Sequence, residues 1–172
     1  SLADDILEEV DRMTGYENFT FTPTTIELTS YVRQPKADLN RALREFLACS
    51  AGVQEIYTYP WISDRMIRAA GADPANLLTL AAPPAPDHAH LRDSLVPGLI
   101  EATAKNLRYF DAFGIFELTQ VFTRGNVSSG SGGETLPLQT NKLGIALTGE
   151  DPVLLFRNLK GILEMMPRSC HF

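Results

Sequence analysis

The segment from Leu91 to Arg124 constrains the fold of this chain more than any other stretch of its sequence. Its first half has the apolar spacing of a helix, and Pro97 stands near the first turn, where the missing N–H of proline costs little. Its second half alternates as a strand does, with one set comprising Ile115, Glu117, Thr119 and Val121 and the other Phe116, Leu118, Gln120 and Phe122. The segment therefore predicts a helix that leads into a strand, with Arg124 at the end of the strand.

The rest of the chain repeats this mixture of helical and extended patterns. We expect helices in DDILEEVDRMT, in KADLNRALREFLACSA, in DRMIRAA and in PVLLFRNLKGILEMM. Gly15, Gly52 and Gly71 are the expected stops, and Ser63 is the expected N-cap of the third helix. Strands are predicted in VQEIYTY up to Pro60, in LLTL and in KLGIALT, and GNVSSGSGGE predicts a loop. The fold class that follows is α+β, a mixed and mainly antiparallel sheet flanked by helices.

Composition narrows the classes of function. The 15 basic and 21 acidic residues give a net charge of −6, which argues against binding of nucleic acid through the overall field of the chain. Cys49 and Cys170 make neither a disulfide framework nor a metal-ligand spacing. No apolar run reaches the length of a membrane span, and the sequence shows no secretory signal. We therefore expect a cytoplasmic protein with no membrane partner.

Several segments, in order, resemble the β subunit of bacterial-type phenylalanyl-tRNA synthetase. They are DDILEEVDRMTGYENF, ALREFLACSAGVQEIYTYPWI, LRDSLVPGLIEATAKNLRYFDAFGIFELTQVF, and the shorter LTG and LKGILE near the end. The resemblance implies a partial core with the architecture of a class II aminoacyl-tRNA synthetase. It predicts that residues 1–35 are the end of a preceding small domain with its linker, and that residues 36–172 are the core-like module.

The resemblance also implies what this module does. It predicts a non-catalytic part of phenylalanine-tRNA ligase that supports assembly with the catalytic α subunit, which attaches phenylalanine to tRNA(Phe) with ATP. The ATP is then bound by the α subunit, so the chain alone is predicted to be inactive. The alternative is a free-standing paralogue that binds an amino acid or a nucleotide.

The catalytic arginine of class II synthetases falls on a different residue in this chain. In that family an arginine in an F-R-x-E/D pattern binds the α-phosphate, and VFTRGN places Thr123 at the position of the arginine. Arg124 comes one position later, which turns its side chain to the opposite face of a strand. A neutral hydroxyl does not neutralise phosphate. We therefore expect no catalytic residue here and interpret Arg124 as a solvated charge.

Three acidic residues form a candidate metal site. Asp5, Glu8 and Glu9 have the spacing of one helical face, and their oxygens suit a hard cation such as Mg²⁺. The resemblance implies that matching positions bind Mg²⁺ shared with the α subunit. The alternative is that acids near the start of a helix complement its dipole.

The segment from Leu39 to Trp61 carries the predicted interface. Class II cores dimerise through the matching helix and strand, and this segment offers more apolar surface than one small sheet needs. Large apolar and aromatic side chains suit a permanent interface. The predicted interface residues are Leu43, Phe46, Leu47, Tyr57, Tyr59 and Trp61.

Overall fold

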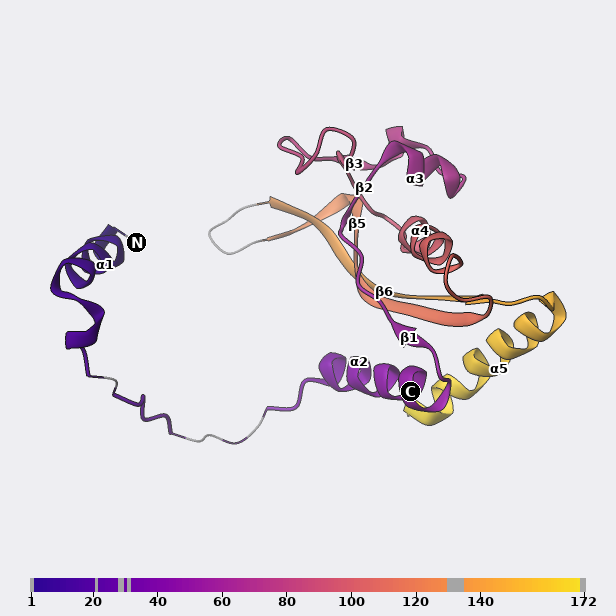
Figure 1. Ribbon diagram of the computed structural model, residues 1–172, viewed down its shortest axis with the longest axis horizontal. Helices are drawn as coiled ribbons and strands as arrows, with labels where there is room; N and C mark the ends of the chain where they lie inside the picture. The colour runs from indigo at the N-terminus through magenta and orange to yellow at the C-terminus, as the bar shows by residue number, and fades with distance from the viewer. Residues whose placement is uncertain (1, 21, 28–29, 31, 130–134, 171–172) are drawn as a thin grey trace. The chain divides into compact units, whose positions relative to one another are not determined.

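The computed structural model describes residues 2–20, 22–27, 30, 32–129 and 135–170 of the chain. These residues fall into two compact units, Ser1–Arg33 and Gln34–Phe172 (Figure 1). The predicted domain boundary after residue 35 lies close to this division. The origin of residues 1–35 in a preceding domain stays a prediction.

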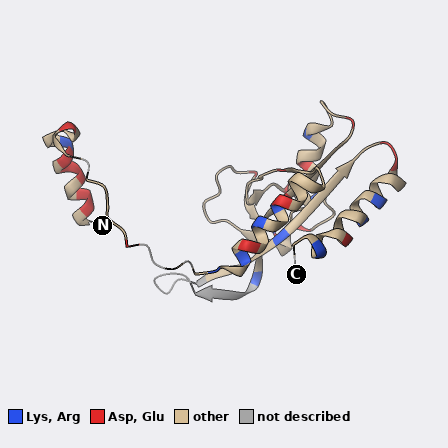
Figure 2. Cartoon of the chain, turned by 90° about the horizontal axis from the view of Figure 1, so that it is seen from below, with Lys and Arg blue, Asp and Glu red and all other residues tan. Residues whose placement is uncertain are grey.

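The smaller unit contains one helix. α1 runs over Leu2–Thr14, as the sequence predicts, and a short 3₁₀ turn follows at Tyr16–Asn18. Gly15 ends the helix with a φ of 89°, a conformation that glycine adopts without steric cost. No residue of α1 is buried, and acidic side chains gather along it (Figure 2). Its apolar stripe, which includes Ile6 and Val10, is therefore exposed.

A long antiparallel hairpin organises the larger unit. β5, Phe113–Ser129, pairs with β6, Thr135–Thr148, and β1, Gln54–Glu55, pairs with β5 in the parallel direction. The prediction of a loop from residue 125 onward is wrong for residues 125–129, because β5 continues through them. The register of the hairpin shifts between Thr123 and Ser128, as at a β-bulge, and pairing resumes at Ser128 and Ser129. Residues 130–134 of the predicted loop lie outside the described residues.

Two helices cover one face of this sheet. α2, Pro35–Glu45, continues into a π-helical segment, Phe46–Ser50, and α5 spans Pro152–Cys170 (Figure 1). Both pack on the side chains of β5 that point to their side. The core on this face contains Leu43, Phe46, Leu47, Val53, Phe116, Leu118, Met166 and Cys170. Burial raises the pKa of the Cys170 thiol.

A third helix covers part of the opposite face. α4, Val96–Asn106, places Leu99 against Ile115 and Val121 of β5. Leu95, which precedes the helix, belongs to the same core. Pro97 lies in the first turn of α4, as predicted. Because Ile115 and Phe116 are consecutive in β5, their side chains enter the two different cores.

A second, smaller sheet lies next to α3, Asp64–Ala69. Its three strands are β2, Trp61–Ile62; β4, His90–Leu91; and β3, Leu78–Thr79, and a 3₁₀ turn at Pro74–Asn76 precedes β3. Ser63 accepts a hydrogen bond from the Met66 N–H and caps α3, as predicted. The predicted strand up to Pro60 is only partly present, because β1 ends at Glu55 and β2 begins after the proline.

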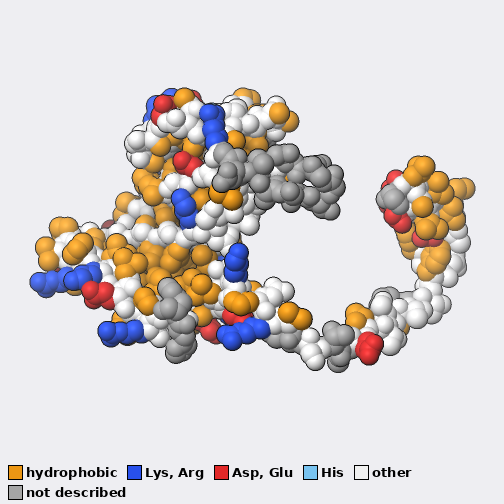
Figure 3. Space-filling model, turned by 180° about the vertical axis from the view of Figure 1, so that it is seen from behind, with side chains coloured by type: hydrophobic (Ala, Val, Ile, Leu, Met, Phe, Trp, Pro, Cys, Tyr) orange, Lys and Arg blue, Asp and Glu red, His pale blue; other side chains and the backbone are white. Residues whose placement is uncertain are grey.

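The larger unit leaves much apolar surface exposed. On the face that Figure 3 shows, apolar side chains form a patch in the middle of this unit. α5 adds exposed apolar side chains, among them Val153, Leu154, Phe156 and Leu163. In the described part of the chain, no helix has the length and apolar character to cross a bilayer. Exposed apolar patches of this kind mark surfaces that bind other proteins.

Candidate functional site

The segment from Ile56 to Pro60 belongs to neither sheet, and together with Trp61, the first residue of β2, it presents three aromatic side chains. Tyr57 is 74% exposed and Tyr59 70% exposed. The rings of Tyr59 and Trp61 stack, with their centroids 4.7 Å apart and their planes 13° from parallel. Pro60 has no N–H to donate, so it interrupts the strand between these two rings. The aromatic segment, residues 56–61, is therefore an exposed and irregular edge of the unit.

Hydrogen bonds to one buried carboxylate hold the middle of the aromatic segment. The N–H of Thr58 donates to Glu117 Oε1 over 3.0 Å, and the Thr58 hydroxyl donates to Glu117 Oε2 over 2.8 Å. Glu117 lies in β5 and its residue is 1% exposed. The carboxylate thus takes the place that a neighbouring strand's carbonyl takes in a sheet.

Arg92 completes this arrangement. Its Nη1 lies 2.9 Å from Glu117 Oε1, and it donates from Nη1 to the Thr58 hydroxyl over 2.8 Å. Its Nε donates to the Gln120 carbonyl and its Nη2 to the Thr119 hydroxyl. The Arg92 side chain is 5% exposed, so the charge is neutralised inside the protein and every contact is charge-assisted.

The backbone of Arg92 joins the same two segments. Its N–H donates to the Pro60 carbonyl over 2.9 Å, and its carbonyl accepts from the Phe122 N–H over 2.8 Å. We call Arg92, Glu117 and Thr58 the buried polar triad. One signal for it is present in the sequence, since Glu117 is the one carboxylate among the residues of β5. Sequence reasoning missed its partner, because Arg92 lies 25 positions away.

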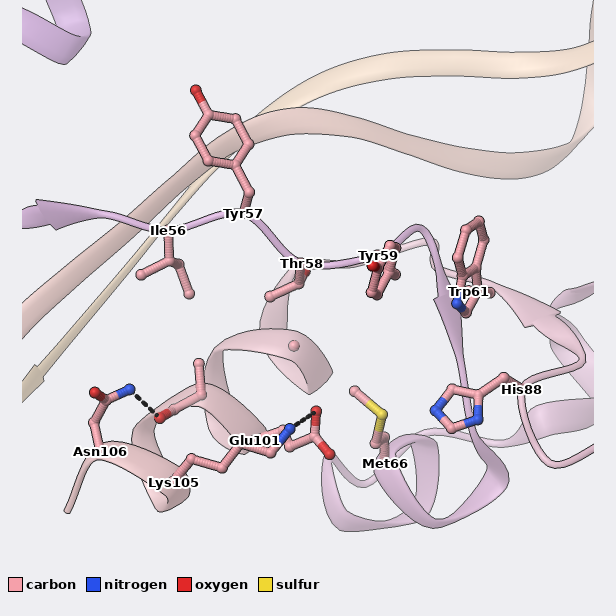
Figure 4. A pocket seen from close by; sticks show the side chains of 12 residues that line it. Ile56, Tyr57, Thr58, Tyr59, Trp61, Met66, His88, Glu101, Lys105 and Asn106 are labelled. Atoms are coloured by element: carbon pink, nitrogen blue, oxygen red, sulfur yellow. Dashed lines mark hydrogen bonds and ion pairs between the residues drawn. The ribbon is translucent and has the colours of Figure 1, made fainter. Parts of the chain in front are cut away.

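A cavity of about 330 Å³ opens beneath the aromatic segment. Figure 4 shows Ile56 pointing toward this cavity, whereas Tyr57 points away from it. α4 forms the opposite wall with Glu101, whose carboxylate lies 3.2 Å from Lys105 Nζ. The complete lining consists of Ile56, Tyr57, Thr58, Tyr59, Trp61, Met66, His88, Gly98, Glu101, Ala102, Lys105 and Asn106. Its aromatic and polar lining is typical of a surface that receives a side chain or a small group.

Half of the predicted interface lies inside the chain's own core. Leu47 is fully buried, Leu43 is 7% exposed and Phe46 is 9% exposed, and all three pack on the α2 and α5 side of β5. They are therefore not available to a partner, and the expectation that they form an interface needs correction. The helical spacing of these residues identified a buried face, but the chain itself covers that face. Tyr57, Tyr59 and Trp61 remain as the candidate contact residues.

The predicted metal ligands do not converge into a site. Asp5, Glu8 and Glu9 lie on α1, as expected, but the Glu9 carboxylate is 3.0 Å from the Arg12 guanidinium. Among the described residues, no group of three or more histidine, cysteine or acidic side chains is arranged to hold a metal ion. An ion pair with arginine competes with binding of a cation, so this trio does not form a metal site by itself.

The predicted position of Arg124 at the end of the strand is wrong, because Thr123 and Arg124 lie inside β5. Thr123 pairs with Leu138 across the hairpin. Arg124 donates from Nη2 to the Leu77 carbonyl over 2.6 Å, so its guanidinium ties β5 to the segment before β3. The interpretation of Arg124 as a solvated charge is thus only partly right, because the residue is exposed but has a specific backbone partner.

Three further contacts join a basic and an acidic side chain. The hydrogen bond to Glu55 raises the pKa of the Arg44 guanidinium, and this pair ties α2 to β1. The hydrogen bond with His88 lowers the pKa of the Asp87 carboxyl. His90 Nε2 lies 3.1 Å from Asp64 Oδ1, which connects β4 to the start of α3. The contacts of Arg44 and His90 connect neighbouring elements, and none of the three contacts pairs a nucleophile with a base.

Comparison with known proteins gives a consistent family. Residues 21–172 match the family model described as the phenylalanyl tRNA synthetase beta chain CLM domain. The chain is 28% identical over 174 residues to the phenylalanine--tRNA ligase beta subunit of Bacillus subtilis, and 32% identical over 152 residues to that of Staphylococcus haemolyticus. These alignments cover 95% and 87% of this chain but only 21% and 18% of those relatives. The chain thus spans about a fifth of the length of its curated relatives.

Solved structures show the fold. A pyrrolysyl tRNA synthetase from Desulfitobacterium hafniense superimposes with a TM-score of 0.56 at 16% identity, over 80% of this chain and 44% of that one. A Giardia lamblia prolyl-tRNA synthetase in complex with prolyl-adenylate gives 0.57 at 10% identity, over 76% and 28%. Both are class II synthetases, so the predicted α+β fold of this class is confirmed.

Proposed function

The chain belongs to the family of the phenylalanyl tRNA synthetase beta chain CLM domain, and from that premise we propose that it is a non-catalytic core module of phenylalanine-tRNA ligase. In this proposal it supports assembly with a catalytic α subunit, which attaches phenylalanine to tRNA(Phe) with ATP. The match of residues 21–172 to the β-chain model is the observation that carries the proposal. The relatives named above are β subunits, which disfavours a free-standing paralogue.

The arrangement of cationic groups supports a module without adenylation chemistry. Binding of a phosphate needs a cation whose hydrogen-bond donors are free to converge on it. Thr123 supplies a neutral hydroxyl, and Arg124 donates to a backbone carbonyl. Arg92 is buried against Glu117. We therefore assign ATP to the α subunit and derive no catalytic step from this chain.

We likewise derive no catalytic step from Mg²⁺ in this chain. The family uses Mg²⁺ and ATP, but Asp5, Glu8 and Glu9 alone do not make a site for the ion. A shared site with the α subunit stays a prediction for these three residues. Since phenylalanine-tRNA ligation serves translation, we place the protein in the cytoplasm.

The surface that supports assembly best is the aromatic segment. Tyr57 and Tyr59 are exposed, Trp61 is half-buried, and a cavity lies beneath them. Aromatic rings beside a pocket are the side chains that contribute most to protein interfaces. We propose that these three residues contact the α subunit directly.

Copurification tests this proposal. The chain is coexpressed with the α subunit from the same genome, and capture of one is measured through a tag on the other. We expect a stable complex, and we expect a Tyr57→Asp, Tyr59→Asp variant to reduce capture about tenfold or more, because charges replace central aromatic contacts. Tyr109→Asp is the matched control, since Tyr109 is 79% exposed on the same unit.

Two results would contradict the proposal. One is capture of the double variant at the level of the Tyr109 control. The other is phenylalanine-dependent exchange of pyrophosphate into ATP by the chain alone, which would make the module catalytic.

A further inference from the structure

We propose that the buried polar triad, Arg92, Glu117 and Thr58, positions the aromatic segment for its protein partner. Arg92 and Glu117 are thereby positioning residues of the interface, acting through Thr58, and they contact no partner themselves. The inference rests on the proposed function for the identity of the partner. The positioning itself is a property of this chain and is measurable without the partner.

The first step of the argument is that the sheet does not hold the aromatic segment. β1 ends at Glu55, and the last ladder-like bond runs from the Ile56 N–H to the Phe116 carbonyl over 2.8 Å. Beyond that point the segment leaves β5, and β2 begins only at Trp61 in the other sheet. Backbone groups that leave a ladder need other partners or they fray.

The second step is that the triad supplies those partners. The Thr58 N–H donates to Glu117, the Thr58 carbonyl accepts from Arg92 Nη1 over 3.3 Å, and the Pro60 carbonyl accepts from the Arg92 N–H. The Thr58 hydroxyl donates to Glu117 and accepts from Arg92, so both of its hydrogen-bonding roles are used. Two residues of the segment, Thr58 and Pro60, are thus held by two residues from elsewhere in the chain.

The third step concerns direction. In an extended segment, neighbouring side chains point to opposite sides, so holding Thr58 inward turns Tyr57 outward. Figure 4 shows Thr58 on the cavity side and Tyr57 on the other. Hydrogen bonds to ionised groups are strong and directional, which apolar packing is not. The triad therefore fixes the direction in which the aromatic side chains point.

The fourth step is the consequence for binding. A flexible aromatic segment loses conformational freedom when it meets its partner, and that loss weakens association. A segment held by the triad has already lost that freedom on folding. We therefore expect the triad to raise affinity for the α subunit without touching it.

The sharpest test is Thr58→Val. Valine has nearly the same shape as threonine but neither donates to Glu117 nor accepts from Arg92. The Arg92–Glu117 ion pair and its bonds to the Thr58 backbone stay, while both bonds of the Thr58 hydroxyl are lost. The matched control is Thr148→Val, because the Thr148 hydroxyl likewise bonds the backbone of Phe113, but at the far end of the hairpin. Each variant thus removes one hydroxyl group that both donates and accepts a hydrogen bond.

Trp61 provides the readout, because it is the only tryptophan of the chain. For Thr58→Val we expect faster quenching of Trp61 fluorescence by acrylamide and about a tenfold loss of affinity for the α subunit. For Thr148→Val we expect neither change. A second variant, Arg92→Met with Glu117→Leu, replaces the buried charges by apolar groups of similar volume, which often preserves stability. It is expected to reproduce both effects of Thr58→Val with little change in unfolding midpoint.

The outcomes separate the two proposals. Wild-type quenching and affinity in Thr58→Val overturn the positioning role, as does an equal loss in Thr148→Val, which would reflect general stability. If the unmodified chain does not bind the α subunit, the proposed function fails. The quenching comparison still decides the positioning role in that case.

Discussion

The two faces of β5 are held to the rest of the unit by different forces. On the side of α2 and α5, Phe116 and Leu118 pack in an apolar core with Leu43, Phe46 and Leu47. On the side of α4, Ile115 and Val121 flank Glu117, whose carboxylate meets Arg92. One strand thus combines an apolar contact surface with a buried ion pair.

The two kinds of contact have different effects on stability and geometry. Apolar burial contributes free energy roughly in proportion to area and tolerates small changes of orientation. The buried ion pair recovers little net free energy after desolvation, but its hydrogen bonds fix distances and angles. We infer that the apolar face stabilises the hairpin, whereas the polar face sets where the aromatic segment lies.

Removing one charge from the polar face is expected to have the largest effect. Arg92→Ala leaves Glu117 buried without its counter-charge, which costs about 3–5 kcal/mol of unfolding free energy. Urea denaturation followed by circular dichroism measures this loss. The control is Arg68→Ala, because Arg68 forms an exposed pair with Asp64 and its loss costs at most about 1 kcal/mol. Similar losses for the two variants would refute the distinction between buried and exposed pairs.

A cavity in the apolar face is expected to cost somewhat less and to leave the aromatic segment unchanged. Leu47→Ala removes a fully buried side chain and lowers the free energy of unfolding by about 3 kcal/mol. Leu154→Ala, at a site 54% exposed on α5, is the control with a change well below that. Acrylamide quenching of Trp61 is expected to stay at the wild-type level in both. Faster quenching in folded Leu47→Ala would show that the two faces are not independent.

The smallest effect on stability is expected for replacing glycine by alanine at two positions in helices. A Cβ on Gly98 of α4 would lie 2.8 Å from the Thr58 hydroxyl, whereas a Cβ on Gly161 of α5 meets nothing within 4 Å. Gly98→Ala therefore pushes on Thr58 and costs about 1–2 kcal/mol net of its gain in helix propensity. Gly161→Ala is expected to stabilise the chain by about 0.5–1 kcal/mol. Thermal unfolding of both variants measures the difference, and stabilisation by Gly98→Ala would mean that Thr58 moves freely.

Local signals predicted much of the fold correctly. Pro97 and Ser63 sit at the helix starts that their chemistry favours, and Gly15 and Gly71 end helices with positive φ. These features depend on a few neighbouring residues, so the sequence contains nearly all of their physics. The class II resemblance then supplied the order of the elements, which local patterns do not determine.

Longer-range features could not be predicted in the same way. The spacing of Leu43, Phe46 and Leu47 identifies a buried face, but it does not tell whether the chain or a partner covers that face. The aromatic segment looked like a strand because it is rich in β-branched and aromatic residues, yet its backbone bonds Glu117 and Arg92 instead of a neighbouring strand. Both errors concern partners far away in the sequence.

The parallel pairing of β1 with β5 has a consequence for the order of folding. β5 and β6 are joined by a short connection and can form a hairpin early, since closing a short loop costs little entropy. Thr58 and Glu117 are 59 positions apart, so the aromatic segment can dock only after a much larger loop closes. We therefore expect the surface offered to the partner to be the last part of the unit to form. In a nascent chain it appears only when the scaffold beneath it is complete.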